Sequence, residues 1–213
     1  MRLQYALTMN DAKSVDAAAL QTSGGGTGLN KADILTALGF LQKRERAGLA
    51  LMYAKYTKDK GESMRAADLA GKFGESLAPQ VVGNDKCSAV IGSILGKLAV
   101  VEYCRTPDTP GAKCRCGGSG LVADHEAFAR LASNPNAPAT ELTKECSRCH
   151  GTGMKALPAA RVFRALQALS PQITERTYYR KWQPLYLDAL NWCYEQEGRA
   201  EVAYKRLTRS EAA

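Results

Sequence analysis

The cysteines are the residues of this chain best suited to do chemistry, and four of the seven occur in two glycine-rich segments. One segment is CRCGGSG, residues 114–120, and the other is CSRCHGTG, residues 146–153. Two nearby thiolates can converge on one tetrahedral ion, and the glycines after them permit a turn that wraps around the sulfur atoms. Each segment supplies half of a tetrahedral site. We therefore predict a zinc ion (Zn2+) bound by Cys114, Cys116, Cys146 and Cys149.

The spacing of these cysteines leaves alternatives open. Cys114 and Cys116 are one residue closer together than a C-x-x-C pair, and the gap between the two pairs is longer than in a zinc ribbon. Cys104 or His150 can therefore replace one ligand. Another alternative is that the thiols are reduced and buried, with the glycines serving only turns. A nucleophilic Cys149 with His150 as its base is disfavoured, because adjacent side chains seldom face each other and no third group orients the histidine.

Four sulfur ligands close a zinc site, so we expect the ion to have a structural role and the protein to have no enzymatic activity. A nuclease, for example, needs clustered acidic or histidine ligands with an open metal position. Asp124 beside His125 is the only hint of this, and an N-cap explains Asp124 more simply. We expect Cys87, Cys193 and Cys104, which lie on helical patterns, to be core thiols.

The charge balance favours an anionic partner. Lys and Arg total 29 against 21 for Asp and Glu, which gives a formal charge of +8 in 213 residues, and nucleic acid is the leading candidate. The odd number of cysteines and the lack of an apolar signal segment predict a reducing, cytoplasmic location. No apolar run is long enough to span a bilayer, so we expect no membrane partner.

Helical patterns predict a mainly α fold. Residues 1–30 are polar and Ala-rich and end in TSGGGTG, which predicts a flexible tail. We expect one helical DNA- and polymerase-binding domain over residues 31–213, with a zinc-binding insert at about 105–155. A first helix is predicted to run from residue 31 to about Tyr56. The clearest helix follows it, with an apolar stripe of Val90, Ile91, Ile94, Leu95 and Leu98.

The segment LPAARVFRALQALSPQITERTYYRKWQPL has the layout of a helix-turn-helix DNA reader: a helix, a tight turn and a second short helix that ends before Pro184. If Tyr178, Trp182 and Leu185 face inward, the outer face carries residue types that suit base edges and phosphates. These candidates for DNA contact are Arg176, Tyr179, Arg180 and Gln183. A solvated amphipathic helix in an α-bundle fits the same periodicity.

Several of these segments resemble a known family. VEYCRTPDTPGAKCRC leading into GGSG, then KECSRCHGTG, LPAARVFRAL and TYYRKWQPLY, are similar to segments of the lambda-type Q late-gene antitermination proteins of bacteriophages. The resemblance extends from about Leu38 to the end of the chain. The family pattern has C-x-x-C in both halves. When the segments are aligned on their glycines, Cys116 matches the second cysteine of its pair and Cys114 lies one position off.

The resemblance implies a zinc-containing, α-helical protein that binds late-promoter DNA in the host cytoplasm and joins RNA polymerase paused early in elongation. It also implies contacts with the flap of the polymerase β subunit and the C-terminal region of sigma, after which polymerase reads through pauses and terminators. Two other functions remain open. One is a zinc-containing DNA-binding regulator of initiation. The other is a zinc-stabilised, chaperone-like protein-binding module, because DnaJ-type chaperones also carry C-x-x-C-x-G-x-G repeats.

Overall fold

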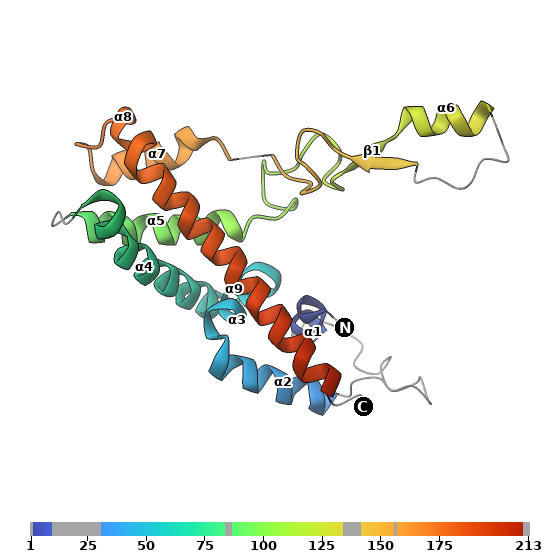
Figure 1. Cartoon of the computed structure of the whole chain (residues 1–213), viewed down its shortest axis with the longest axis horizontal. Helices are drawn as coiled ribbons and strands as arrows, with labels where there is room; N and C mark the ends of the chain where they lie inside the picture. Colours follow the sequence, from blue (N-terminus) through green and yellow to red (C-terminus); the bar gives the residue numbers. More distant parts are fainter. Residues whose placement is uncertain (1, 10–30, 84–86, 134–141, 156, 211–213) are drawn as a thin grey trace. The chain divides into compact units, whose positions relative to one another are not determined.

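The computed structural model of the chain describes residues 2–9, 31–83, 87–133, 142–155 and 157–210. The chain divides into two compact units (Figure 1). The helical unit comprises Met1–Cys104 and Ala159–Ala213, and the cysteine unit comprises Arg105–Pro158. The fold is mainly α-helical, as the sequence predicts. None of the helices in the described ranges has the length and apolar character needed to cross a membrane.

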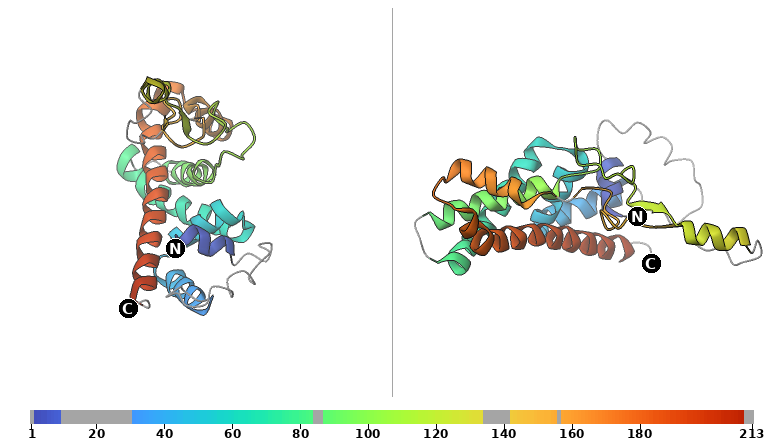
Figure 2. Two further views of the ribbon diagram at one scale, coloured as in Figure 1. Left: turned by 90° about the vertical axis from the view of Figure 1, so that its right-hand side faces the viewer. Right: turned by 90° about the horizontal axis from the view of Figure 1, so that it is seen from above.

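The helical unit is built around its last helix, which packs along α2, α3, α4 and α5 (Figure 2, red). Short π-helical segments, labelled η, follow α3 and α8. The elements are α1 (Leu3–Met9), α2 (Lys31–Arg44), α3 (Arg46–Met52), η2 (Tyr53–Thr57), α4 (Lys60–Val82), α5 (Ser88–Tyr103), α7 (Ala159–Leu169), α8 (Glu175–Thr177), η3 (Tyr178–Trp182) and α9 (Gln183–Ser210).

Helix α1 corrects part of the predicted N-terminal tail. Leu3 and Leu7 are fully buried in a core cluster that also contains residues of α2, α3 and α9. The Leu3 N–H donates to Oε2 of Glu201 on α9 at 2.9 Å, which satisfies one of the free donors at the start of α1. The apolar residues of LQYAL therefore belong to the core of the helical unit. The rest of the predicted tail, residues 10–30, lies outside the described residues.

The predicted helix over 31–56 is interrupted at Glu45, where φ is −121° and ψ is 44°. The break separates α2 from α3, and it lets both helices direct apolar side chains toward the same core. Ile34, Leu38 and Leu41 of α2 are buried there, as their spacing predicts. The periodicity therefore located the buried residues correctly but missed the bend between the two helices.

Helices α4 and α5 approach so closely that only glycine fits at their contact. A side chain at Gly92 would overlap the carbonyl oxygen of Gly74, and one at Gly96 would overlap that of Ala70. Of the predicted stripe, Ile91 and Leu95 are buried and Ile94 and Leu98 are half-buried, but Val90 is 61% exposed. Gly92 and Gly96, which were not part of the stripe, are buried. A pattern based on hydrophobic residues cannot identify buried glycines, so it missed this part of the contact.

The cysteine unit contains little regular structure: β1 (Leu121–Ala123), α6 (His125–Ser133) and β2 (Thr143–Glu145). The two strands pair in an antiparallel sheet with Leu121 opposite Glu145. An isolated antiparallel bridge joins Lys113 to Met154. These pairings bring the two glycine-rich segments, which are far apart in sequence, into one small unit.

Candidate metal centre and nucleic-acid interface

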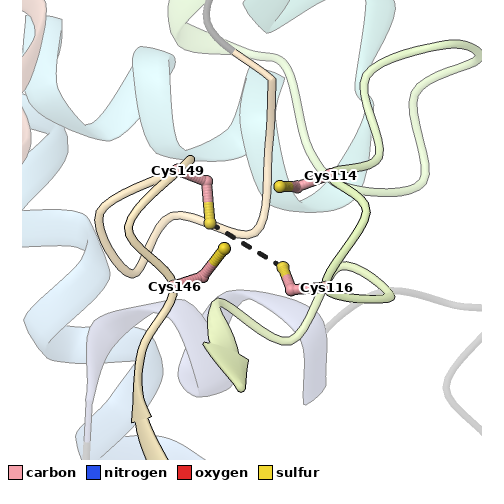
Figure 3. Close-up of side chains that lie close together, drawn as sticks. All are labelled: Cys114, Cys116, Cys146 and Cys149. Carbon is pink, nitrogen blue, oxygen red and sulfur yellow. Dashed lines mark hydrogen bonds between the residues drawn. The ribbon is translucent and has the colours of Figure 1, made fainter.

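The four cysteines of the two glycine-rich segments lie together in the cysteine unit. Their Sγ atoms are all within 4.8 Å of one another, and Figure 3 shows them pointing toward a common centre from two loops. The Cys116 and Cys149 sulfur atoms are 3.8 Å apart. Three of the four residues are buried, and the fourth is half-buried. The structure thus places side by side the four residues that the sequence predicts to share a metal site: Cys114, Cys116, Cys146 and Cys149.

The two segments are held against each other by matching backbone hydrogen bonds. The Cys114 N–H donates to the carbonyl of Gly153 at 2.9 Å, and the Cys146 N–H donates to the carbonyl of Gly120 at 2.8 Å. Each bond runs from the first cysteine of one segment to the last glycine of the other. The pairing of the two loops therefore has approximate two-fold symmetry.

The hydroxyl side chains follow the same symmetry. The Ser119 hydroxyl donates to the Cys116 carbonyl at 3.0 Å, and the Thr152 hydroxyl donates to the Cys149 carbonyl at 2.7 Å. Each hydroxyl also accepts from the backbone N–H two residues further on. Neither residue was predicted from the sequence, although both stand between two glycines, in GSG and GTG. They fix the turn that follows the second cysteine of each pair.

The backbone conformations of the two loops correspond residue by residue. Both adopt the left-handed region, with positive φ, at the same three positions. Two of the three pairs are glycine in both loops. In the third pair, glycine in the first loop corresponds to a histidine with φ of 46° in the second. The matched pairs are Gly117 with His150, Gly118 with Gly151, and Gly120 with Gly153.

This correspondence explains how Cys114 joins the cluster despite the missing residue. In the second loop, the N–H of His150 donates to the Cys146 carbonyl four residues back at 2.8 Å. In the first loop, the N–H of Gly117 donates to the Cys114 carbonyl three residues back at 3.1 Å. The first loop therefore joins its two cysteines by a tighter turn than the second loop does, and its first cysteine still reaches the cluster. Neither alternative ligand, His150 or Cys104, belongs to the sulfur cluster found among the described residues.

The backbone also tunes the thiols of the cluster. Burial raises the pKa of Cys116, but N–H groups of Gly118 and Gly120 and the neighbouring thiols outweigh it, so the pKa falls to about 7. Burial raises the pKa of Cys149 to about 11, opposed by the N–H of Gly153 and reinforced by the neighbouring thiols. Cys116 is therefore the first of the two thiols to ionise as the pH rises.

Asp124, the one acidic residue considered for enzymatic chemistry, has a structural role. Its Oδ1 accepts from the N–H of Glu126 at 3.2 Å, as an N-cap of α6 does, and from Nζ of Lys144 at the same distance. Desolvation opposes ionisation, but the hydrogen bond and charge of Lys144, together with backbone donors, lower the pKa of Asp124. The carboxylate is therefore engaged in a cap and an ion pair.

Helix α7 packs against the short helical stretch that follows it. Val162 and Leu166 are buried, and the ring of Phe163 lies 5.4 Å from that of Tyr178, centroid to centroid. Leu169, predicted for the same face, is 63% exposed. The N–H of Thr177 donates to the hydroxyl of Thr174 at 3.2 Å, and this cap starts α8 as the sequence predicts.

The inward and outward faces of the second helical stretch are as predicted. Tyr178, Trp182 and Leu185 are all buried. On the outside of the same stretch lie the residues predicted to contact DNA, of which the first three are exposed and the fourth is half-buried: Arg176, Tyr179, Arg180 and Gln183. The burial pattern fits a surface helix as well as a DNA-reading helix.

The predicted end of this helix before Pro184 is wrong. The N–H of Gln183 donates to the carbonyl of Tyr178, five residues back, which is the π-helical pattern. Helices α8 and η3 therefore continue directly into α9, and Pro184 lies in the first turn of α9. Proline has no N–H to donate, and a first turn tolerates this.

Comparisons with known proteins show what this chain is similar to. Residues 108–201, which include the sulfur cluster and the α7–α8 pair, match the family described as antitermination protein Q. The antitermination protein Q of Escherichia phage lambda is 28% identical over 191 residues, covering 85% of this chain and 86% of that protein. The chain is similar to the Q antitermination proteins of lambda-like phages over most of its length. The resemblance found in the sequence is thereby confirmed.

Two further Q proteins match to the same extent. That of Escherichia phage HK022 is 28% identical over 183 residues, which is 81% of this chain and 83% of that protein. That of Salmonella phage P22 is 28% identical over 189 residues, which is 85% of this chain and 86% of that protein. The similarity to Q proteins therefore extends over both the helical and the cysteine units.

Proposed function

We propose that this protein is a phage transcription antitermination factor that acts in the cytoplasm of a bacterial host. It binds late-promoter DNA, joins RNA polymerase paused early in elongation, and promotes read-through of pauses and terminators. On polymerase it contacts the β flap and the C-terminal region of sigma. The observation that carries the proposal is the match to proteins named antitermination protein Q over 85% of the chain.

We propose zinc as the ion at the sulfur cluster. In a tetrahedral site with Zn–S bonds of about 2.3 Å, the sulfur atoms lie about 3.8 Å apart. In the structure the Cys116 and Cys149 sulfur atoms are 3.8 Å apart, and all four sulfur atoms lie within 4.8 Å of one another. Four sulfur donors suit zinc and leave no position for a reacting water, which supports a structural role and a protein without enzymatic activity.

We propose that the outer face of α8 and η3 contacts the DNA. Arg176 and Arg180 are exposed, and neither makes an ion pair with any residue that the structure describes. Their guanidinium groups are therefore available for base edges or phosphates. Behind them, the buried ring of Tyr178 and its contact with Phe163 of α7 hold the helical stretch in place.

The proposed function is tested by single-round transcription on a template with a late promoter and a strong terminator downstream. Adding the protein should raise the fraction of transcripts that pass the terminator, and deleting the late-promoter element should abolish the rise. A regulator of initiation cannot act this way, because single-round conditions remove any effect of initiation frequency. An unchanged read-through fraction together with tight, specific DNA binding would favour that alternative.

A further inference from the structure

The cysteine unit contains a hollow of about 400 Å³ beside the sulfur cluster. Its lining consists of one cluster cysteine and three basic residues: Cys114, Arg115, Arg148 and Lys155. We propose that this hollow binds phosphate groups of a nucleic-acid backbone. The site lies in a different unit from the DNA-contacting face of α8 and η3, so it adds a second nucleic-acid contact to the protein.

The two arginines converge because the loops that carry them are equivalent. Arg115 directly precedes Cys116, and Arg148 directly precedes Cys149, so each stands immediately before the second cysteine of its pair. The hydrogen-bonded pairing of the loops fixes the backbone at both positions. The geometry of the sulfur cluster therefore fixes the backbone positions from which the two arginine side chains extend.

Lys155 is held beside them by its backbone. Its N–H donates to the carbonyl of Ala112 at 2.7 Å, and its own carbonyl accepts from Nη2 of Arg105 at 3.0 Å. Both bonds involve the backbone of Lys155 and not its ammonium group. A substitution at this side chain consequently leaves the backbone pairing intact.

The three cations lack acidic partners among the residues that the structure describes. Arg115, Arg148 and Lys155 are exposed and belong to no ion pair there. Lys144 of the same unit, in contrast, is paired with Asp124 at 3.2 Å. Three uncompensated positive charges around one hollow favour an anionic ligand.

The chemistry of the lining matches a phosphodiester. Guanidinium groups bind phosphate through two parallel hydrogen bonds, and an ammonium group adds a point charge. The hollow has room for a phosphate together with its sugar, which suits a backbone rather than a free ion. The choice of nucleic acid over an acidic peptide rests on the proposed function.

The arginines have one competing role. Four thiolates with one divalent ion carry a net charge of about −2, and nearby cations can stabilise that charge without binding any ligand. Lys155 separates the two roles, because it is six positions after Cys149 and does not flank a cysteine. A test must therefore include Lys155 alone as well as the arginines.

The experiment measures binding of the full-length, zinc-loaded protein to two labelled probes without any promoter element, a 20-base-pair DNA duplex and a 20-nucleotide RNA strand. Affinities are measured between 50 and 200 mM salt. Lys155→Gln is compared with Lys113→Gln, and Arg148→Gln with Arg130→Gln. The control residues are exposed cations of the same unit that do not line the hollow. The zinc content of every variant is measured in parallel.

Each hollow variant should bind roughly five- to tenfold more weakly near 0.1 M salt, and its salt slope should fall by about 0.9 for duplex DNA or about 0.7 for RNA. The controls should change by less than half as much. The probe whose affinity and salt slope fall identifies whether the phosphate belongs to DNA or to RNA. Arg115→Gln should behave like Arg148→Gln, with zinc retained.

Equal affinities and slopes for the hollow variants and their controls, on both probes, would overturn the proposal. Loss of zinc from the arginine variants, with Lys155→Gln binding like Lys113→Gln, would assign the arginines to the thiolate charge instead. Stronger competition by an acidic peptide than by an oligonucleotide of equal charge would assign the hollow to a protein. Because these probes contain no promoter element, none of these outcomes decides whether the protein supports read-through.

Discussion

The helical unit and the cysteine unit are stabilised by different means. The core of the helical unit is made of large apolar side chains such as Leu41, Leu51 and Tyr204, all fully buried. The buried cluster of the cysteine unit consists of thiols, Cys114, Cys146 and Cys149, with half-buried Cys116 and Val122 packed against them. Burying a large apolar side chain contributes about 1.5–3 kcal/mol. A unit with few such side chains needs another source of folding free energy.

Metal binding is the source that the sulfur cluster offers. A structural zinc site contributes about 10–16 kcal/mol of apparent binding free energy at neutral pH, and this becomes folding free energy where no site exists in the unfolded chain. The helical unit, with its apolar core, should fold without the ion. The two units of one chain should therefore respond differently to the same treatment.

The largest expected effect is loss of the cysteine unit on removal of the ion. A chelator, or Cys149→Ser, should remove the zinc and unfold residues 105–158, because about 10–16 kcal/mol of binding free energy is lost. Limited proteolysis should then cut within this segment. Circular dichroism should still report most of the helix content, since α6 is the one helix of the cysteine unit among the residues that the structure describes.

Cys87→Ser is the matched control, because Cys87 is exposed rather than a core thiol as its helical pattern suggested. This variant should keep one zinc per chain and the proteolytic pattern of the unaltered protein. Resistance of residues 105–158 to protease after complete removal of zinc would contradict metal-dependent folding.

The converse effect is expected at the contact between α4 and α5. Gly92→Val should destabilise the helical unit by about 3 kcal/mol, because the new side chain overlaps the backbone of α4. Zinc content should not change. Chemical denaturation followed by circular dichroism measures the loss.

Gly39→Ala provides the control for this substitution. Gly39 lies in α2 with nothing within 4 Å of an added Cβ, so alanine should raise stability by about 0.5–1 kcal/mol through its higher helix propensity. If both glycine variants shifted the denaturation midpoint equally, the close helix contact would not be what Gly92 provides.

Sequence-specific DNA binding should depend on the helical unit. Alanine at Arg176 and Arg180 together should weaken binding to the specific site by about 1–3 kcal/mol and relax base preference if either arginine reads a base edge. Arg206→Ala, a change at an exposed arginine of α9, should have little effect. Near-normal specific binding by the double variant, with its circular dichroism spectrum intact, would place the reading helix elsewhere.

A smaller effect tests the equivalence of the two cysteine loops. His150 adopts a φ of 46° at the position where the first loop has Gly117. A left-handed conformation costs a non-glycine residue about 1–2 kcal/mol, so His150→Gly should slow zinc loss to a chelator by about fivefold or more. Gly151→Ala, at a φ of 77°, should accelerate it. Equal rates for the two variants would argue against strain at His150.

The sequence predicted the cysteine unit and the helical unit with unequal success. The clustered cysteines were identified because metal-binding chemistry requires particular residue types at close spacing. The participation of Cys114 depended on its hydrogen bond to Gly153, which no spacing rule contains. The ligand assignment itself stays a prediction until the metal is measured.

In the helical unit, periodicity located most buried apolar residues but missed features set by the backbone. The glycines of α5 lie against the backbone of α4 while Val90 is exposed, and the π-helical turn carries the helix through Pro184. Helix α1 was missed because its few apolar residues stand next to a long polar segment. Each of these errors arose where tertiary packing, rather than local pattern, decided the conformation.

Read-through by the Cys149→Ser and Cys87→Ser variants is the most direct test of the central claim, that antitermination requires a zinc-stabilised cysteine unit. Both are compared with the unaltered protein in single-round transcription past a downstream terminator, at equal protein concentration. Cys87→Ser should support the full increase in read-through, and Cys149→Ser should support none. A full increase with zinc-free Cys149→Ser would contradict the account.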